Sequence, residues 1–256
     1  MDFQFLYILI TGILIGGVAG YLGTLTISKR MALSIDPLGH LALPGVALGL
    51  LYGLDISLCA FLFIILGMIL IWYFEIKTKL PTETLTAIVF TLGVAITFLF
   101  FPLDHDELEQ AFIGDISKVN FSDVLFTLFL SLLLFFIVKK IYQKIILINI
   151  SEDLAKIEKI NIKKYNFLYL LSIAIIVALG TKIVGGLLSA ALVAIPAATS
   201  RNLSKNLSQF SFLSVLFGIL SALIGIFLFK ITGIQAGPLI ILSSTFFFFI
   251  SLFKLN

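Results

Sequence analysis

The chain has 256 residues, of which 60% are hydrophobic and only 12% are charged, with a net charge of +3. Soluble domains contain about 45–50% apolar and about 25% charged residues, so this composition excludes a soluble enzyme or a soluble nucleic-acid-binding protein and indicates an integral membrane protein. The single cysteine, Cys59, excludes a disulfide framework and a cysteine-based metal cluster.

Apolar runs long enough to cross a bilayer, about 20 residues each, recur along the whole chain. We therefore expect one transmembrane domain, 1–256, built as an all-α polytopic bundle of eight to nine membrane segments, some of them short or broken. The run 167–200 is too long for one straight span, and its central glycines and Lys182 predict a break near 181–182. With this break the predicted passages are 5–27, 32–53, 56–75, 84–103, 122–142, 167–181, 183–200, 210–229 and 237–253.

Basic residues concentrate in alternate connections between these passages. These alternate connections hold 14 of the 17 basic residues. The remaining three, Lys118, Lys182 and Lys230, lie in the other set of connections. Because cytoplasmic loops carry the excess of lysine and arginine, this pattern predicts an N-terminus outside the cell membrane and a C-terminus in the cytoplasm.

The first passage carries Gly12, Gly16 and Gly20, two overlapping GxxxG patterns. Small residues at this spacing allow the backbones of two helices to approach closely. The pattern therefore predicts tight packing rather than chemistry.

Asp36 and His40 lie four residues apart in an otherwise apolar stretch, on one face of a helix. A carboxylate and an imidazole so placed make half of a site for a divalent metal ion. Each ionisable group within a membrane costs about 2.5–3.5 kcal/mol on insertion scales, which favours a functional interpretation. The structural alternative is that Asp36 caps a helix starting at Pro37 while His40 bonds a neighbouring carbonyl.

Helix-disrupting residues bracket His40: Pro37, Gly39, Pro44 and Gly45. They predict a kinked or unwound helix of the kind that binds ions in transporters. If this helix begins near Arg30, a rise of about 1.5 Å per residue puts His40 about 15 Å deep, near mid-bilayer.

The predicted outer loop, 104–120, is acidic and contains the other histidine, His105. With Asp104 and Asp106 it could hold a metal weakly, or it could simply be a solvated loop that attracts cations. The sequence leaves both interpretations open.

The chain lacks the phosphate-binding GxxxxGK[ST] motif, the HExxH zinc motif and the GxSxG nucleophile motif. An enzyme would have only Asp36 and His40 to work with. We therefore expect no catalysis by this chain and no permanently bound cofactor.

Several segments resemble the membrane permease subunits of ABC importers for zinc, manganese or iron. The segment 28–49 is similar to the family's basic-Met-Ala stretch and its Asp…His…Pro-Gly pattern, although Pro37 and Gly39 replace a small residue and a serine. The segment 185–201 is similar to the family's Gly-x-Leu-Leu…Pro-Ala-Ala-Thr pattern. Weaker matches are 114–119 and 237–242, the latter without the family's preceding Asp and Pro.

The resemblance implies a homodimer around a central path, with Asp36 and His40 lining it. It also implies two cytoplasmic ATPase subunits, which fits the missing phosphate-binding motif, and an extracytoplasmic metal-binding protein. We expect the segment from Pro196 to about Leu207, which includes Ser200, Arg201 and Lys205, to contact the ATPase. Proline disrupts helices, so Pro196 is expected to break the helix where this segment opens. The alternative contact is a helix at 151–161.

Two other functions fit the same sequence features. One is a permease for chelated iron or a cobalamin-like ligand, and the other is an ion-coupled secondary transporter that needs no ATP. One carboxylate and one imidazole suit zinc, manganese and iron alike, so the sequence does not choose the metal.

Overall fold

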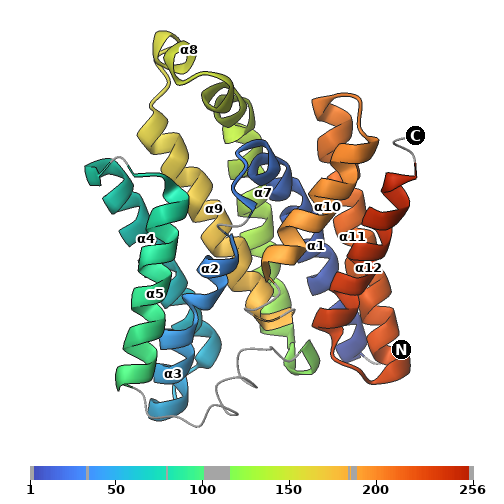
Figure 1. The fold of residues 1–256 in the computed structure, drawn as a ribbon. Coiled ribbons are helices and arrows are strands. Elements are labelled where there is room, and N and C mark those ends of the chain that lie inside the picture. The colour runs from blue at the N-terminus through green and yellow to red at the C-terminus, as the bar shows by residue number, and fades with distance from the viewer. Residues whose placement is uncertain are drawn as a thin grey trace.

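The computed structural model describes residues 3–32, 35–78, 80–100, 116–183, 185 and 189–253, and these fold as a bundle of helices (Figure 1). The all-α prediction is confirmed, since the described residues contain no strand. The elements in chain order are α1 (Phe3–Ser28), α2 (Ile35–His40), α3 (Leu43–Tyr52), α4 (Ile56–Thr78), α5 (Thr82–Phe100), the short 3₁₀ helix η2 (Ile116–Lys118), α7 (Phe121–Ile150), α8 (Glu152–Ile157), α9 (Ile162–Ile183), α10 (Ser189–Leu203), α11 (Leu207–Thr232) and α12 (Ala236–Leu252).

Within the described ranges, seven helical segments are long and apolar enough to cross a membrane, counting α2 and α3 together as Ile35–Tyr52. The shorter α12 is also apolar. The remaining predicted passage, 183–200, corresponds to α10, which has 15 residues. The expected architecture of eight to nine segments, some short or broken, is confirmed.

The glycine pattern of α1 packs against α11, as the GxxxG spacing predicts. A Cβ atom added at Gly16 would lie 2.5 Å from the carbonyl oxygen of Gly218, and one at Gly20 would collide with the carbonyl of Ser214. The Ser214 hydroxyl donates a hydrogen bond to the Gly20 carbonyl at 2.5 Å. The two backbones are therefore in direct contact through positions where only glycine fits.

The predicted break around His40 is present, since α2 ends at His40 and α3 begins at Leu43. The backbone N–H groups of Leu41 and Ala42 each bond a carbonyl three residues back, at 3.2 Å, so the chain tightens between the two helices. Pro44 occupies the first turn of α3, where its missing N–H costs nothing.

The break in the run 167–200 lies slightly later than predicted. Helix α9 continues through Thr181 and Lys182 to Ile183, and Gly185 has a φ of 89°, in the left-handed region that suits glycine. The expectation that Pro196 breaks a helix is wrong, because Pro196 lies inside α10. Packing of α10 against α1, α11 and α12 stabilises it despite the lost hydrogen bond.

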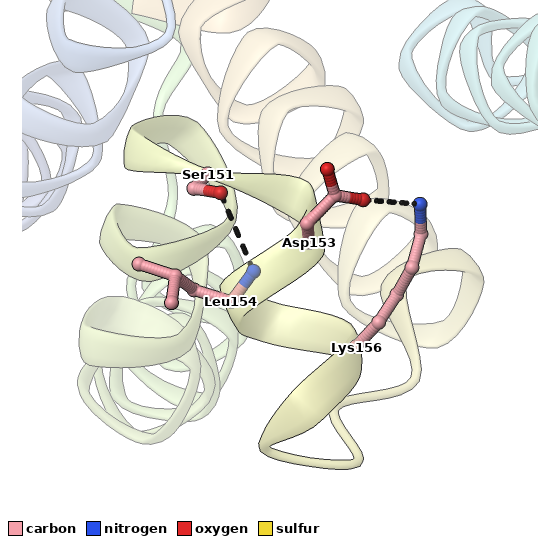
Figure 2. Close-up of polar contacts among 4 residues, drawn as sticks. All are labelled: Ser151, Asp153, Leu154 and Lys156. Carbon is pink, nitrogen blue, oxygen red and sulfur yellow. Dashed lines mark hydrogen bonds and ion pairs between the residues drawn. The ribbon is translucent and has the colours of Figure 1, made fainter.

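Helix α7 runs eight residues further than the passage predicted at 122–142. Ile145 and Ile148 are buried, so packing continues beyond the apolar run. Ser151 then ends α7 and caps α8 by accepting a hydrogen bond from the Leu154 N–H (Figure 2). The chain therefore turns sharply into α8 at the end of the bundle (Figure 1).

The start of α1 and the end of α12 lie at opposite ends of the bundle (Figure 1). The α7–α8 corner and the α10–α11 corner lie together at the end where α12 finishes. The corners that carry most of the basic residues therefore lie at the same end of the bundle, as the sequence predicted. We call the end that holds the α7–α8 and α10–α11 corners the basic end.

Candidate functional site

Helix α2 lies among other helices, packing against α4, α5, α9 and α10 (Figure 1). Its six residues present two different faces. Ile35, Leu38 and Gly39 are buried, whereas Asp36 is exposed and His40 is half-buried. The Asp–His pair therefore lies on the side of α2 that a single copy of this chain leaves partly open.

The His40 Nδ1 atom lies 3.0 Å from the backbone carbonyl oxygen of Asp36. A carbonyl oxygen can only accept, so Nδ1 carries the hydrogen and the ring lone pair resides on Nε2. This contact matches one half of the structural alternative, in which His40 bonds a neighbouring carbonyl. A backbone carbonyl at Nδ1 is also the kind of partner that orients metal-ligating histidines.

The other half of the structural alternative is wrong. Asp36 lies within the first turn of α2 rather than at its N-cap, and its carboxylate makes no hydrogen bond to any residue that the structure describes. An exposed carboxylate one turn from an oriented imidazole remains a pair of potential metal ligands.

The His40 ring also packs edge-on against Phe90 of α5, with ring centroids 5.3 Å apart. This contact and the Asp36 carbonyl together restrain the imidazole. The depth estimate from Arg30 needs correction, because α2 begins only at Ile35. From Ile35, five residues at about 1.5 Å each put His40 about 7.5 Å along the segment, half the depth estimated from Arg30.

Among the residues that the structure describes, no group of three or more histidine, cysteine or acidic side chains could hold a metal. Asp36 and His40 therefore supply two ligands from one copy, as half of a site. The weaker candidates His105, Asp104 and Asp106 lie outside the described residues.

The predicted ATPase-contact segment divides into internal and external residues. Pro196 and Ser200 are buried, and the Ser200 hydroxyl donates to the Phe210 carbonyl at 2.6 Å. Arg201 and Lys205 are exposed, with the Arg201 guanidinium 5.6 Å from the centre of the Phe210 ring. The buried hydrogen bond stiffens the α10–α11 corner, and the two cations are the residues that a partner could touch.

A polar cluster at the basic end was not anticipated from the sequence. The Lys29 ammonium donates to Asn166 at 3.0 Å and lies 4.8 Å from the centre of the Tyr169 ring. Asn166 donates to the Glu75 carboxylate at 3.3 Å, which also accepts from the Thr82 hydroxyl at 3.2 Å. Burial lowers the pKa of Lys29, and the negative charge of Glu75 opposes that shift.

This cluster ties together the ends of α1, α4, α5 and α9, close to where the chain enters α2. Its members lie far apart in the sequence, so the sequence analysis used Lys29 only to predict the membrane orientation. The one sequence signal near this cluster is the Lys-Arg-Met run that begins at Lys29.

Residues 2–255 match the model of the ABC 3 transport family. The chain belongs to this family. It is 31% identical over 256 residues to the high-affinity zinc uptake system membrane protein ZnuB of Haemophilus influenzae, covering 96% of this chain and 95% of that protein. It is 27% identical over 254 residues to the manganese transport system membrane protein MntC of Listeria monocytogenes, covering 98% and 91%.

Among solved structures, PsaBC from Streptococcus pneumoniae in complex with Fab superposes with a TM-score of 0.82 at 28% identity, covering 98% of this chain and 92% of that one. The resemblance inferred from the segments around His40 and Pro196 is confirmed. This ABC 3 permease is accordingly a multi-pass protein of the bacterial inner membrane.

Proposed function

We propose that this permease is the membrane subunit of an ATP-driven importer for divalent metal ions, and that Asp36 and His40 line its path. The observation that carries the proposal is the partly open face of α2, where the Asp36 carboxylate has no hydrogen-bond partner among the described residues and the His40 ring is oriented by the Asp36 carbonyl. Relatives named for zinc and manganese transport support these two ions, and the ligand pair also suits iron.

A homodimer would complete the site. Two copies facing each other would supply two carboxylates and two imidazoles, a ligand set typical of zinc or manganese. Small exposed residues flank α2 on α5, where Ala87, Thr91 and Ala95 follow one another at helical spacing. Such rows let a second copy approach closely. The metal ion would then be held by Asp36 and His40 of both copies. When the dimer rearranges and the copies separate, the ion loses half of its ligands and is released.

ATP hydrolysis belongs to a separate subunit in this proposal, since the chain has no phosphate-binding motif. The exposed Arg201 and Lys205 at the α10–α11 corner are the proposed contact with that subunit. The buried Ser200–Phe210 hydrogen bond ties α10 to α11 at this corner. A displacement of Lys205 by the ATPase would therefore move both helices together.

The basic end faces the cytoplasm in this proposal, and the opposite end, with the predicted acidic loop 104–120, receives metal from an extracytoplasmic binding protein. The support is the 14-to-3 partition of basic residues. The weaker loop ligands His105, Asp104 and Asp106 would act only as an outer cation-attracting surface.

The experiment is uptake into vesicles that contain the permease, its co-expressed ATPase and its binding protein. We expect uptake of free Zn²⁺ or Mn²⁺ only when ATP is supplied on the ATPase side. Uptake of chelated iron or a cobalamin-like ligand but not of free metal would favour the first alternative function. Uptake without ATP, driven by an ion gradient, would favour a secondary transporter.

A further inference from the structure

A groove of about 610 Å³ opens at the basic end between α7, the last third of α1 and the start of α11. Its walls are the apolar side chains of Ile146, Leu147, Ile150 and Leu207. Its polar lining consists of Tyr21, Tyr142, Gln143, Ser208 and Ser211. The groove is separate from α2 and shares no residue with the proposed metal path.

Two of the polar groups of the groove keep hydrogen-bonding capacity. The Leu207 carbonyl accepts the one Ser211 hydroxyl hydrogen at 3.1 Å, so the Tyr142 hydroxyl, 3.0 Å from Ser211 Oγ, donates to Ser211. Tyr142 also stacks on Tyr21 with centroids 5.6 Å apart, so it shapes the groove and has no hydrogen to spare. The side chains of Gln143 and Ser208 have no hydrogen-bond partner among the residues that the structure describes. Two side chains with unused donors thus line one apolar-walled groove.

Along α7 and α11 the charges near the groove are all basic, while Glu152 and Asp153 follow at the start of α8. Helix α7 brings the exposed Lys139, Lys140 and Lys144, and no acidic residue occurs in α7 after Asp123. The chain contains no acidic residue at all after Glu158, so the α11 side of the groove has none either. Lys139 precedes Gln143 by one helical turn and therefore lies on the same face of α7. These charges favour an anionic occupant.

Depth distinguishes a lipid from a soluble partner. If the hydrocarbon core starts near Phe121, about 20 residues of α7 cross it, which ends the core near Lys140. Counting 20 residues back along α11 from Thr232 ends the core near Phe212. Both helices put the groove just beyond the hydrocarbon, at the level of the headgroups. Phe136 and Phe212, which are 64% and 68% exposed, lie immediately below, where acyl chains would run.

We propose that this groove binds the headgroup of an anionic phospholipid from the cytoplasmic leaflet. Gln143 and Ser208 donate hydrogen bonds to the phosphate, the α7 lysines supply the counter-charge, and the apolar walls contact the upper acyl chains. The proposal rests on the membrane orientation given above but not on the metal path, and its readout involves no metal.

The test measures which lipids stay bound when the intact permease–ATPase complex is extracted from vesicles of equal phosphatidylglycerol and phosphatidylcholine, using native mass spectrometry. The groove variant combines Lys139→Gln, Lys140→Gln and Lys144→Gln. The matched control combines Lys156→Gln, Lys163→Gln and Lys164→Gln, which removes the same charge at the same end of the molecule. Gln143→Leu removes one unused donor and leaves the charge unchanged.

We expect the wild-type complex to retain phosphatidylglycerol preferentially, and the groove variant to lose this preference by about fivefold for each lysine that reaches a headgroup. The control variant should stay within about twofold of wild type, and Gln143→Leu should show a smaller loss without a change in charge. Equal losses in both lysine variants would overturn the proposal, because the attraction would then be diffuse. Reduced ATPase retention with unchanged lipid retention would show a protein-docking groove instead. If the triple variant does not fold, an unchanged lipid preference in Gln143→Leu would also overturn the proposal.

Discussion

Replacement of Gly16 by alanine should loosen the contact between α1 and α11. The new Cβ would lie 2.5 Å from the Gly218 carbonyl oxygen and 3.1 Å from the Ala222 Cβ, and a backbone carbonyl cannot swing aside as a flexible side chain can. The two helices must separate by several tenths of an ångström. Overpacking of this kind costs about 1–3 kcal/mol.

Gly93→Ala in α5 is the matched control. A Cβ at Gly93 meets only Leu41 and Pro44 side-chain carbons, at 3.5 and 3.7 Å, which is ordinary contact. Alanine is a better helix former than glycine by about 1 kcal/mol, and both substitutions share this gain. The difference between the two variants therefore isolates the steric term.

The assay is thermal unfolding of the purified permease in detergent. We expect Gly16→Ala to melt several degrees below Gly93→Ala, since about 2 kcal/mol corresponds to roughly 4–8 °C in a chain of this size. Gly218→Ala should behave like Gly16→Ala, and the double variant should cost less than the sum because both act on one contact. Equal melting temperatures for Gly16→Ala and Gly93→Ala would refute the close-packing argument.

Three further predictions concern the basic end. Glu75→Gln removes the stronger of the two negative charges, Glu75 and Glu152, that act on the Lys29 ammonium. It should destabilise the permease by about 1–2 kcal/mol in thermal melts, with the loss reduced in a Lys29→Met background. Lys205→Glu should weaken retention of the ATPase about tenfold in pull-downs, whereas the same reversal at Lys156 should have little effect; the opposite ranking would favour the α8 contact. In a cysteine-free background, a cysteine at Leu54 should react with an impermeant thiol reagent in intact cells and one at Lys156 should not, and reversed labelling would contradict the orientation.

Local patterns in the sequence were sufficient for the features that depend on neighbouring residues. The spacing of Asp36 and His40 placed both on one helical turn, and the surrounding prolines and glycines predicted the break between α2 and α3. The glycines of α1 predicted close packing, because helical periodicity alone places residues four apart on one face of the helix. What the pattern could not supply was the partner, since Gly218 lies some 200 residues further along the chain.

Features that depend on tertiary contacts were missed or misplaced. The Lys29 cluster needs Glu75 and Asn166, which only the folded bundle brings together. Pro196 suggested a helix break, but the surrounding helices hold α10 together across it. Ser200 belongs to the segment predicted to contact the ATPase, and the structure shows its side chain buried in a hydrogen bond to the next helix.

The Asp153–Lys156 ion pair of α8 is a local feature whose function the structure does not reveal (Figure 2). Both side chains are largely exposed, so this ion pair contributes little to stability. The helix predicted at this point is present. The ion pair would look the same if α8 were simply a solvated helix or if it were the alternative contact with the ATPase. Only the pull-down comparison with Lys205 separates the two.

The most direct test of the proposed function is metal uptake by Asp36→Asn and His40→Gln in the reconstituted importer, with Asp55→Asn, an exposed carboxylate between α3 and α4, as control. Each of the two site variants keeps the size and polarity of the side chain while weakening or removing a metal ligand, so uptake should fall at least about tenfold with permease abundance and ATPase retention unchanged. The control should transport normally. Near-normal uptake by either site variant, or loss of uptake only because the protein no longer accumulates in the membrane, would contradict a metal path lined by Asp36 and His40.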